Sequence, residues 1–374
     1  MNNPSLKVAL VHDHLTQYGG AEQVLGVLRQ IYPAAPIYTL VYDQRAMGDM
    51  FPADIVKPSF LQRLPGGIRR YQWLLPLMPW ATECHNLSNY DLVISSASAF
   101  AKGVITTGQT LHVCYCHTPT RYLWSDTHNY VASLRYPGFI KAMVPALFPR
   151  LRVWDWQAAQ RPDFMFANSE TVRNRIKRYY SRDSVVLYPP VAVDDFSSVS
   201  STITGSYFLT GGRLVGYKRF DIVVEAFNRL RLPLTVFGDG PARCGLEQLA
   251  KPNIRFTGFC KAADLVKLYA GCQAFIHPQV EDFGITAVEA MATGRPVIAY
   301  TRGGALETVR AGETGVFFEE QSWESLADTV ARYRPADFDS AHIRRQAQRF
   351  SIASFRQRWS EEINKLLNNK LLGL

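Results

Sequence analysis

The 374-residue sequence lacks the features of a secreted or membrane-spanning protein. No window reaches the roughly 18 uninterrupted apolar residues that a transmembrane helix needs. The amino terminus, M-N-N-P-S-L-K, leads directly into an expected strand and has no apolar signal-peptide core. The six cysteines include no C-x-x-C pair, and their use fits a reducing compartment. These absences predict a cytoplasmic protein.

Several functional fingerprints are also missing. The first strand and turn lack the G-x-G-x-x-G pattern and the downstream acid of dinucleotide-binding proteins, which argues against an NAD-dependent oxidoreductase. No helix-turn-helix, RNA-binding or zinc-finger pattern is present, so we expect no nucleic-acid partner. Internal repeats and low-complexity tracts are absent as well.

What is present describes a globular α/β protein. Hydrophobic residues make up 47% and charged residues 20% of the chain, and the length suits about two domains. Short apolar runs alternate with helical patterns, which predicts parallel sheets and two doubly wound, Rossmann-like domains. The expected strands lie at 8–11, 92–95, 111–115, 164–167, 185–188, 207–210, 234–237, 254–256, 274–277, 297–300 and 316–318. A Pro-Pro pair and a polar Ser/Thr-rich linker at 194–205 predict domains at 1–190 and 191–350, followed by a terminal helix within 351–374.

Two glutamates eight positions apart, Glu281 and Glu289, are the most informative pair. They lie between two predicted strands, with a helix beginning near Gly284. The first amide N–H groups of that helix have no intrahelical acceptor and favour an anion. Those groups belong to Phe283, Gly284, Ile285 and Thr286. Both carboxylates would border the anion site and could accept hydrogen bonds from sugar hydroxyls. The alternative is a solvated helix with a polar first turn.

A glycine-rich basic turn, T-G-G-R-L-V-G-Y-K-R, occupies residues 210–219. It follows an apolar run and precedes a helical pattern. Glycines let the backbone approach a ligand closely, and Arg213 and Lys218 can supply charge-assisted hydrogen bonds to a diphosphate. A basic loop at a helix start is the alternative.

The first strand runs into a loop and then a helix that opens at Gly19 and Gly20. His12 and His14 in this loop could suggest a metal site. No third ligand follows in the sequence, so we predict no metal.

Another strand ends at Cys116, because Pro119 stops further pairing. His117 is then presented at the carboxyl end of a strand, where open α/β sheets bind ligands. The alternative is a structural histidine. Three side chains just beyond it could line an acceptor site: Arg121, Tyr122 and Trp124.

Together these segments resemble the retaining glycosyltransferases of family 4, which have two Rossmann-like domains facing a cleft (the GT-B architecture). The E-x7-E pair, the G-R-x4-K element and the Gly-Gly loop are similar to motifs of that family. The stretch H-T-P-x-R-Y-x-W most resembles the subgroup that includes mannosyltransferases of bacterial surface-polysaccharide assembly.

The resemblance implies an amino-terminal acceptor domain, a carboxy-terminal nucleotide-sugar domain and a last helix that crosses back to the first domain. It also implies the site roles. Gly19 and Gly20 allow the donor phosphate and the acceptor to approach. Arg213 and Lys218 bind the donor diphosphate. The transferred sugar contacts Glu281 and His117, and the ribose contacts Glu289.

The expected reaction is therefore metal-independent transfer of a hexose, with mannose from GDP-mannose favoured, to a polyprenyl-diphosphate-linked or saccharide acceptor. The resemblance implies retention at the anomeric carbon, with no assigned covalent nucleophile. A UDP-sugar donor, a nucleotide-sugar epimerase of related fold and a non-catalytic sugar-binding scaffold are the alternatives.

The positive charge is concentrated in the first half. Residues 1–190 hold 19 Lys and Arg against 12 Asp and Glu, a net of +7, out of +9 for the whole chain. Two stretches there, 57–80 and 135–156, mix Arg and Lys with Trp, Tyr, Phe and Leu, and prolines interrupt both. That composition is typical of surfaces that lie at a lipid interface, and predicts peripheral attachment to the inner face of the plasma membrane. The alternative is that the aromatic residues are core.

Overall fold

The computed structural model describes residues 6–68, 70–127, 138–196 and 205–371, with only the backbone given for 138–145. It divides into two compact units, one of Met1–Pro189 with Arg356–Leu374 and the other of Pro190–Phe355. The expected boundary lay at 190/191. Arg69, residues 135–137 of the second aromatic stretch, and 197–204 of the expected linker lie outside the described residues.

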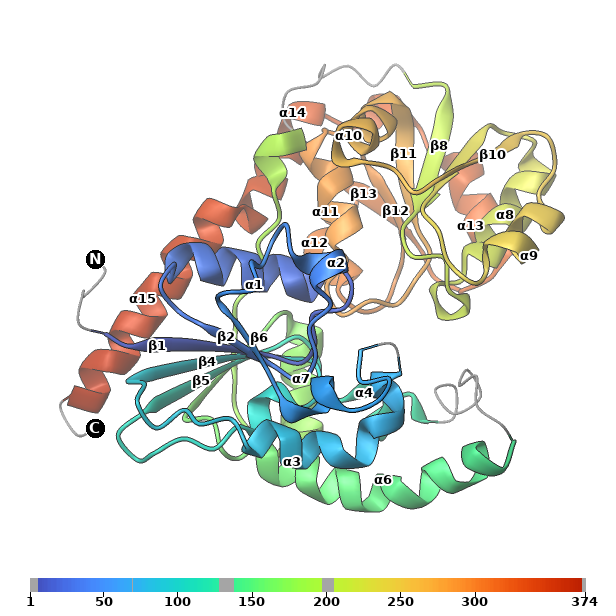
Figure 1. Ribbon diagram of the computed structural model, residues 1–374. Coiled ribbons are helices and arrows are strands. Elements are labelled where there is room, and N and C mark those ends of the chain that lie inside the picture. The colour runs from blue at the N-terminus through green and yellow to red at the C-terminus, as the bar shows by residue number, and fades with distance from the viewer. Residues whose placement is uncertain (1–5, 69, 128–137, 197–204, 372–374) are drawn as a thin grey trace. The chain divides into compact units, whose positions relative to one another are not determined.

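Seven parallel strands form the sheet of the first unit, in the order β3-β2-β1-β4-β5-β6-β7. Their bounds are β1 Val8–His12, β2 Ile37–Thr39, β3 Val56–Pro58, β4 Leu92–Ala97, β5 Leu111–Cys116, β6 Phe164–Ala167 and β7 Val185–Val186. The helices are α1 Gly20–Ile31, α2 Gln44–Met47, α3 Met78–Glu83, α4 Arg121–Trp124, α6 Gly138–Ala158, α7 Glu170–Tyr180 and α15 Ile352–Leu371. In this unit α1 and α15 lie over one face of the sheet, and α3 and α6 lie on the other (Figure 1).

Six parallel strands form the sheet of the second unit, in the order β10-β9-β8-β11-β12-β13. Their bounds are β8 Tyr207–Gly211, β9 Leu234–Phe237, β10 Ile254–Gly258, β11 Cys272–His277, β12 Val297–Tyr300 and β13 Gly315–Phe318. The helices are α8 Phe220–Leu230, α9 Arg243–Leu249, α10 Ala262–Gly271, α11 Ile285–Ala292, α12 Ala305–Thr308, α13 Trp323–Arg332 and α14 Ser340–Ala347.

The strands follow from continuous apolar runs, because a parallel sheet covered by helices is buried on both faces. All five residues of β1 and all six of β5 are buried. The helices carry apolar stripes at helical spacing: Phe220, Val223, Val224 and Phe227 of α8 all face the core of the second unit. The doubly wound α/β fold predicted for both halves is confirmed.

Both sheets place the candidate motifs at equivalent points. The strand order reverses between β1 and β4 in the first unit and between β8 and β11 in the second. Loops that leave neighbouring strands at such a reversal diverge and leave a crevice for ligands. The Gly-Gly loop follows β1, the basic turn follows β8, and the E-x7-E loop follows β11.

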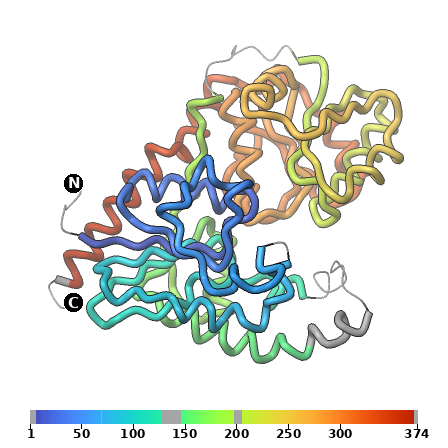
Figure 2. Tube along the Cα trace, viewed as in Figure 1, coloured from blue at the N-terminus to red at the C-terminus, as the bar shows by residue number. Residues whose placement is uncertain are grey.

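The last helix, red in Figure 2, returns to the first unit. Trp359 of α15 is fully buried, with its ring 5.3 Å from that of Phe166 on β6. Its indole N–H donates to the Tyr32 hydroxyl, beyond α1, at 3.1 Å, and Arg356 contacts Gln30.

One expectation about local structure was wrong. The prolines do not divide the second aromatic stretch, because α6 runs continuously through Pro145 and Pro149. A proline removes one backbone hydrogen bond and kinks a helix without having to end it, and buried Phe148 and Leu151 hold this one against the core. Within the expected linker, Asp194 to Phe196 belong to a 3-10 turn, Val193–Phe196, in which Phe196 is buried. None of the described helices is both long and apolar enough to cross a bilayer.

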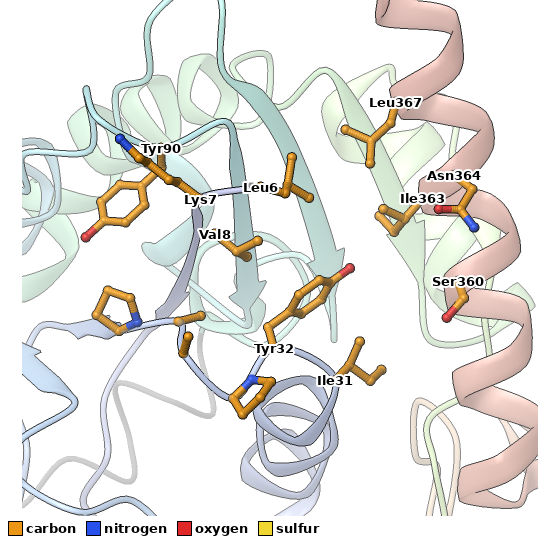
Figure 3. Close-up of a pocket in the computed structure, with 14 residues that line it drawn as sticks. Leu6, Lys7, Val8, Ile31, Tyr32, Tyr90, Ser360, Ile363, Asn364 and Leu367 are labelled. Atoms are coloured by element: carbon orange, nitrogen blue, oxygen red, sulfur yellow. The ribbon is translucent and has the colours of Figure 1, made fainter. Parts of the chain in front are cut away.

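A cavity of about 460 Å³ lies beside the amino-terminal end of β1, between that strand and α15 (Figure 3). Its lining is mostly apolar and includes Val8, Tyr32, Ile363 and Leu367. The candidate motifs follow the carboxyl ends of the strands, so this cavity is not the candidate site.

Candidate active site

The second unit brings two of the predicted donor residues together. Lys218, in the turn after β8, and Glu281, in the loop after β11, form an ion pair with Nζ and Oε1 2.7 Å apart. Their side chains are 12% and 21% exposed, so the pair is partly shielded from solvent yet reachable. Arg213 of the same turn is exposed and makes no ion pair within the part of the chain that the structure describes. Three charged groups are thus arranged at one strand-order reversal.

Helix α11 begins where the sequence predicts. Gly284 precedes its first residue, with φ of 92°, a conformation that side-chain-bearing residues rarely adopt. A Cβ atom there would lie 3.2 Å from Nε2 of His277. The Phe283 ring is buried edge-on against Phe350 at 5.3 Å, so only the main chain of Phe283 can serve a ligand. The N–H groups from Phe283 to Thr286 form the amino-terminal turn that favours an anion.

Neighbouring turns support this loop. The Gly304 N–H donates to the carbonyl of Glu281 at 2.8 Å. A Cβ atom at Gly304 would lie 2.4 Å from Cα of Phe283, so only glycine allows this approach. The Gly-Gly turn after β12 therefore holds the Glu281 loop in place.

Glu289 lies in the second turn of α11, where Tyr269 donates its hydroxyl to Oε2 at 3.0 Å. Burial raises the pKa of Glu289 to about 7; the Tyr269 hydrogen bond opposes the shift and the charge of Glu281 adds to it. The ionised carboxylate is thus costly here, and a hydroxyl donor would stabilise it.

His277, the last residue of β11, was missed by the sequence analysis. It is fully buried, and neither ring nitrogen has a hydrogen-bond partner among the described residues. Burial lowers its pKa to about 4; Glu281 opposes that shift and Lys218 adds to it. Its position at the carboxyl end of a strand was the signal that identified His117, and it could have identified His277 too.

In the first unit His117 lies directly after β5, with Nε2 2.7 Å from the Ser96 hydroxyl of β4. Burial, with a further contribution from His12, lowers the pKa of His117 to about 4, so the ring is neutral at physiological pH. His12 lies between Ser96 and Glu22 of α1. Its Nδ1 is 3.1 Å from the Ser96 hydroxyl oxygen, and its Nε2 is 3.4 Å from Oε1 of Glu22.

Asp13 was not predicted as a site residue, yet it ties two site loops together. Its carboxylate accepts four backbone N–H groups after β4, from Ser98, Ala99, Phe100 and Ala101, at 2.6–2.9 Å. Burial would raise its pKa, but His12, His14 and these hydrogen bonds hold it below the usual value. The loop after β1 is therefore fixed to the loop after β4.

Gly19 and Gly20 are placed as expected, at the start of α1. A Cβ atom on Gly19 would lie 3.0 Å from Oε2 of Glu22. Within the described ranges no group of three or more His, Cys, Asp or Glu side chains could hold a metal ion. Metal independence of the reaction stays a prediction.

The predicted acceptor residues lie in α4, where Trp124 is committed to packing. Its indole N–H donates to Asp155 at 2.7 Å and its ring stacks on Tyr179 at 5.4 Å. Asp155 also forms a buried ion pair with Lys102 at 2.6 Å. This arrangement favours a structural role for Trp124. Acceptor binding by the half-buried Arg121 and Tyr122 stays a prediction.

Residues 195–350 match the family described as glycosyl transferases group 1. Over 146 residues the chain is 32% identical to a GDP-mannose-dependent alpha-mannosyltransferase of Mycolicibacterium smegmatis, covering 39% of this chain and 36% of the relative. Over 158 residues it is 29% identical to O-antigen chain mannosyltransferase C of Escherichia coli, covering 39% of this chain and 41% of that one. The chain thus aligns with well under half of each relative.

Solved structures extend the likeness in fold to almost the whole chain. HepE of Anabaena, determined in complex with UDP, superposes with a TM-score of 0.69 over 96% of this chain and 100% of its own, at 19% identity. The chain therefore has the GT-B fold, and residues 195–350 of it are similar to the group 1 family of glycosyl transferases.

Proposed function

We propose that this protein is a retaining hexosyltransferase that uses a nucleotide diphosphate sugar. The observation that carries the proposal is the Lys218–Glu281 ion pair at the strand-order reversal of the unit matched by the family. A cation for a diphosphate and a carboxylate for sugar hydroxyls lie in contact, beside the amino terminus of α11 and the exposed Arg213. A non-catalytic scaffold would not need this charge arrangement.

The proposed chemistry breaks the bond between the sugar C1 and the β-phosphate oxygen and forms a bond between C1 and an acceptor hydroxyl oxygen. The acceptor proton passes to the departing diphosphate, and the anomeric configuration is retained. Negative charge grows on the β-phosphate, where Lys218, Arg213 and the first turn of α11 stabilise it without a metal ion. Glu281 and His117 hold hydroxyls of the transferred sugar, and Glu289 holds the ribose.

For the donor we propose GDP-mannose. The support is the sequence around His117 and the names of two relatives, one a GDP-mannose-dependent mannosyltransferase and one an O-antigen chain mannosyltransferase. For the acceptor we propose a polyprenyl-diphosphate-linked or other saccharide of cell-surface polysaccharide synthesis. A UDP-sugar donor is the second candidate, favoured by the fold it shares with a protein solved with UDP.

Binding and turnover test this proposal together. We expect GDP and GDP-mannose to raise the unfolding temperature, since a ligand at 100 times its Kd adds about 2.7 kcal/mol of stability. Release of GDP from GDP-mannose should require a lipid-linked or other saccharide acceptor and persist in EDTA. If UDP raises the unfolding temperature and GDP does not, the donor is a UDP-sugar and not GDP-mannose. Conversion of a nucleotide sugar without an acceptor would instead indicate an epimerase, and loss of activity in EDTA that Mg²⁺ restores would refute metal independence.

We further propose that the first unit attaches to an anionic membrane surface. Trp73 and Trp80 are 47% and 59% exposed, and Leu77 between them is also exposed. The guanidinium of Arg70 lies 5.9 Å from the Trp73 ring. Exposed indoles beside cations suit the headgroup region of a bilayer. Leu61 and Leu75 of the same stretch are core. Its aromatic residues Phe60 and Tyr71 pack against them and are partly buried, as the alternative interpretation held for the aromatic residues.

A further inference from the structure

Four buried polar side chains form a continuous row behind the candidate site of the first unit. The row runs from Glu22 through His12 and Ser96 to His117. The hydrogen-bond distances between successive side chains are 3.4, 3.1 and 2.7 Å. The row crosses three neighbouring strands, because β4 lies between β1 and β5 and His12 is paired in register with Ser96. The sheet itself thus sets the order of these side chains.

The carboxylate at one end sets the direction of the hydrogen bonds. Burial raises the pKa of Glu22, but the hydrogen bond and charge of His12 outweigh that effect and leave the pKa lowered, so the ionised carboxylate only accepts. A neutral His12 must then donate through Nε2, which leaves Nδ1 as an acceptor. The Ser96 hydroxyl donates to that nitrogen, and the Ser96 oxygen accepts from Nε2 of His117.

This direction determines what His117 offers to a ligand. Its proton is on Nε2, so Nδ1 carries a lone pair, and no described residue is hydrogen-bonded to Nδ1. We propose that Glu22, His12 and Ser96 are positioning residues that hold His117 in the Nε2–H tautomer, so that Nδ1 accepts a hydrogen bond from a hydroxyl group of the transferred sugar. The identity of that hydroxyl rests on the proposed function; the tautomer does not.

Two further charged or titratable neighbours, Asp13 and His14, have other partners than the four side chains of this row. The Asp13 carboxylate is engaged by four backbone N–H groups, and His14 packs against the Tyr71 ring at 5.0 Å. A doubly protonated His12 would donate from both nitrogens. Ser96 would then turn its proton toward His117, and Nδ1 of His117 would become a donor. The tautomer of His117 therefore reports the direction of the whole row.

Nitrogen-15 NMR of the full chain, labelled at histidine, reads this tautomer directly, because protonated and bare ring nitrogens resonate far apart. We expect only Nε2 of His117 to be protonated in the wild type. Ser96→Ala should give a mixture of tautomers. Glu22→Gln should do the same, because an amide can donate as well as accept. A wild type protonated on Nδ1, or a Ser96→Ala spectrum identical to the wild type, would overturn the proposal.

The same sheet offers a matched control. Ser95 lies beside Ser96 on β4 and makes an equally buried hydrogen bond to Nε2 of His112 at 2.9 Å, outside this row. Ser95→Ala removes a bond of the same kind and should leave the His117 resonances unchanged. A shift of the His117 tautomer in Ser95→Ala would mean that the spectra report general loosening of the sheet, and would contradict the proposed direction.

Kinetics with the nucleotide sugar and acceptor separate this role from a merely structural one. Ser96→Ala should lower kcat by about tenfold, the worth of one hydrogen bond, with the donor KM nearly unchanged. Ser96→Thr, which keeps the hydroxyl, should restore kcat. If Ser96→Ala alters the His117 tautomer but leaves kcat unchanged, Nδ1 of His117 does not bind a hydroxyl group of the transferred sugar. If the wild type turns over no nucleotide sugar, the proposed function fails while the NMR result still decides the tautomer.

Discussion

At the scale of single residues, the proposed donor would replace Glu281 as the partner of Lys218. In the structure its ammonium group neutralises Glu281 at 2.7 Å. A diphosphate has more charge and more acceptor oxygens than a carboxylate, so it would compete for Lys218 and leave Glu281 to sugar hydroxyls. The ion pair thus keeps both side chains ordered before the donor arrives.

We therefore expect Lys218→Ala and Glu281→Ala to act on different steps. Loss of Lys218 should weaken nucleoside diphosphate binding by roughly 10- to 100-fold, the worth of a charged hydrogen bond. Loss of Glu281 should lower kcat by orders of magnitude while nucleoside diphosphate still binds, as should His117→Ala. Isothermal titration calorimetry and initial rates measure the two effects. Lys267→Ala, an exposed lysine of α10, is the control. Wild-type turnover in Glu281→Ala would remove this glutamate from the mechanism.

Glu289 gives a pH-dependent prediction. Its pKa rises from an ordinary value of 4.5 to about 7 in the folded protein. The folded state thus holds a proton that the unfolded state releases, and the free energy of unfolding falls as pH rises from about 4.5 to about 7. Glu289→Gln should remove that fall, by on the order of 1–3 kcal/mol. Urea unfolding at pH 5 and pH 7.5 tests this, with exposed Glu320→Gln as control. Equal pH dependence in wild type and Glu289→Gln would be the contrary result.

At the scale of elements, the sequence predicted most of the strands and the loops that follow them. All eleven expected strands are present, although β7 has only two residues, Val185–Val186. The two that were missed, β2 and β3, have three residues each. Strand order lies outside any local pattern, because it depends on pairing between distant segments. The contacts between Ser96 and His117 and between Trp124 and Asp155 were hidden for the same reason.

A prediction at this scale concerns the hydrogen bonds by which Asp13, after β1, holds the loop after β4. Asp13→Asn loses a charge and places an amide group against four backbone donors, so we expect a loss of about 2–4 kcal/mol in the free energy of unfolding. Because the Asp13 pKa is lowered, its contribution is present above pH about 4 and is lost as pH falls through the folded pKa. Chemical denaturation at pH 7 measures it. Asp91→Asn, an exposed carboxylate with one backbone donor, should cost less than about 1 kcal/mol. If both variants lose the same free energy of unfolding, the four hydrogen bonds to Asp13 stabilise the fold no more than the single one to Asp91.

At the scale of the whole molecule, the chain crosses between its units twice, near Pro189 and near Phe355, so that α15 completes the first unit. Each unit carries its own candidate residues at its own strand-order reversal. His117 with its hydrogen-bonded row belongs to the first, and the Lys218–Glu281 pair to the second. Residues 195–350, which match the family model, include only the second set.

Membrane attachment through the exposed aromatic and basic side chains of residues 63–80 is the prediction for the molecule as a whole. Sedimentation with anionic liposomes should be strong at low salt and weak at high salt, since salt screens exposed charges. Arg63→Glu with Arg70→Glu should lower affinity by at least about 30-fold, at ~1 kcal/mol per basic residue. Trp73→Ser with Trp80→Ser should weaken binding that persists at high salt, because the indoles act through apolar contact.

Matched changes in the second unit complete the test. Phe259 is 82% exposed, and Lys267 and Arg332 have side chains 79% and 78% exposed. Phe259→Ser, and the pair Lys267→Glu with Arg332→Glu, should leave liposome binding unchanged, although the charge-reversal pair lowers the net charge as much as Arg63→Glu with Arg70→Glu does. If these variants lose binding as fully as the Arg63 and Arg70 variant, attachment depends on net charge alone. If the Arg63 and Arg70 variant still binds, residues 63–80 are not the anchor, and the indoles of Trp73 and Trp80 face solvent for another reason.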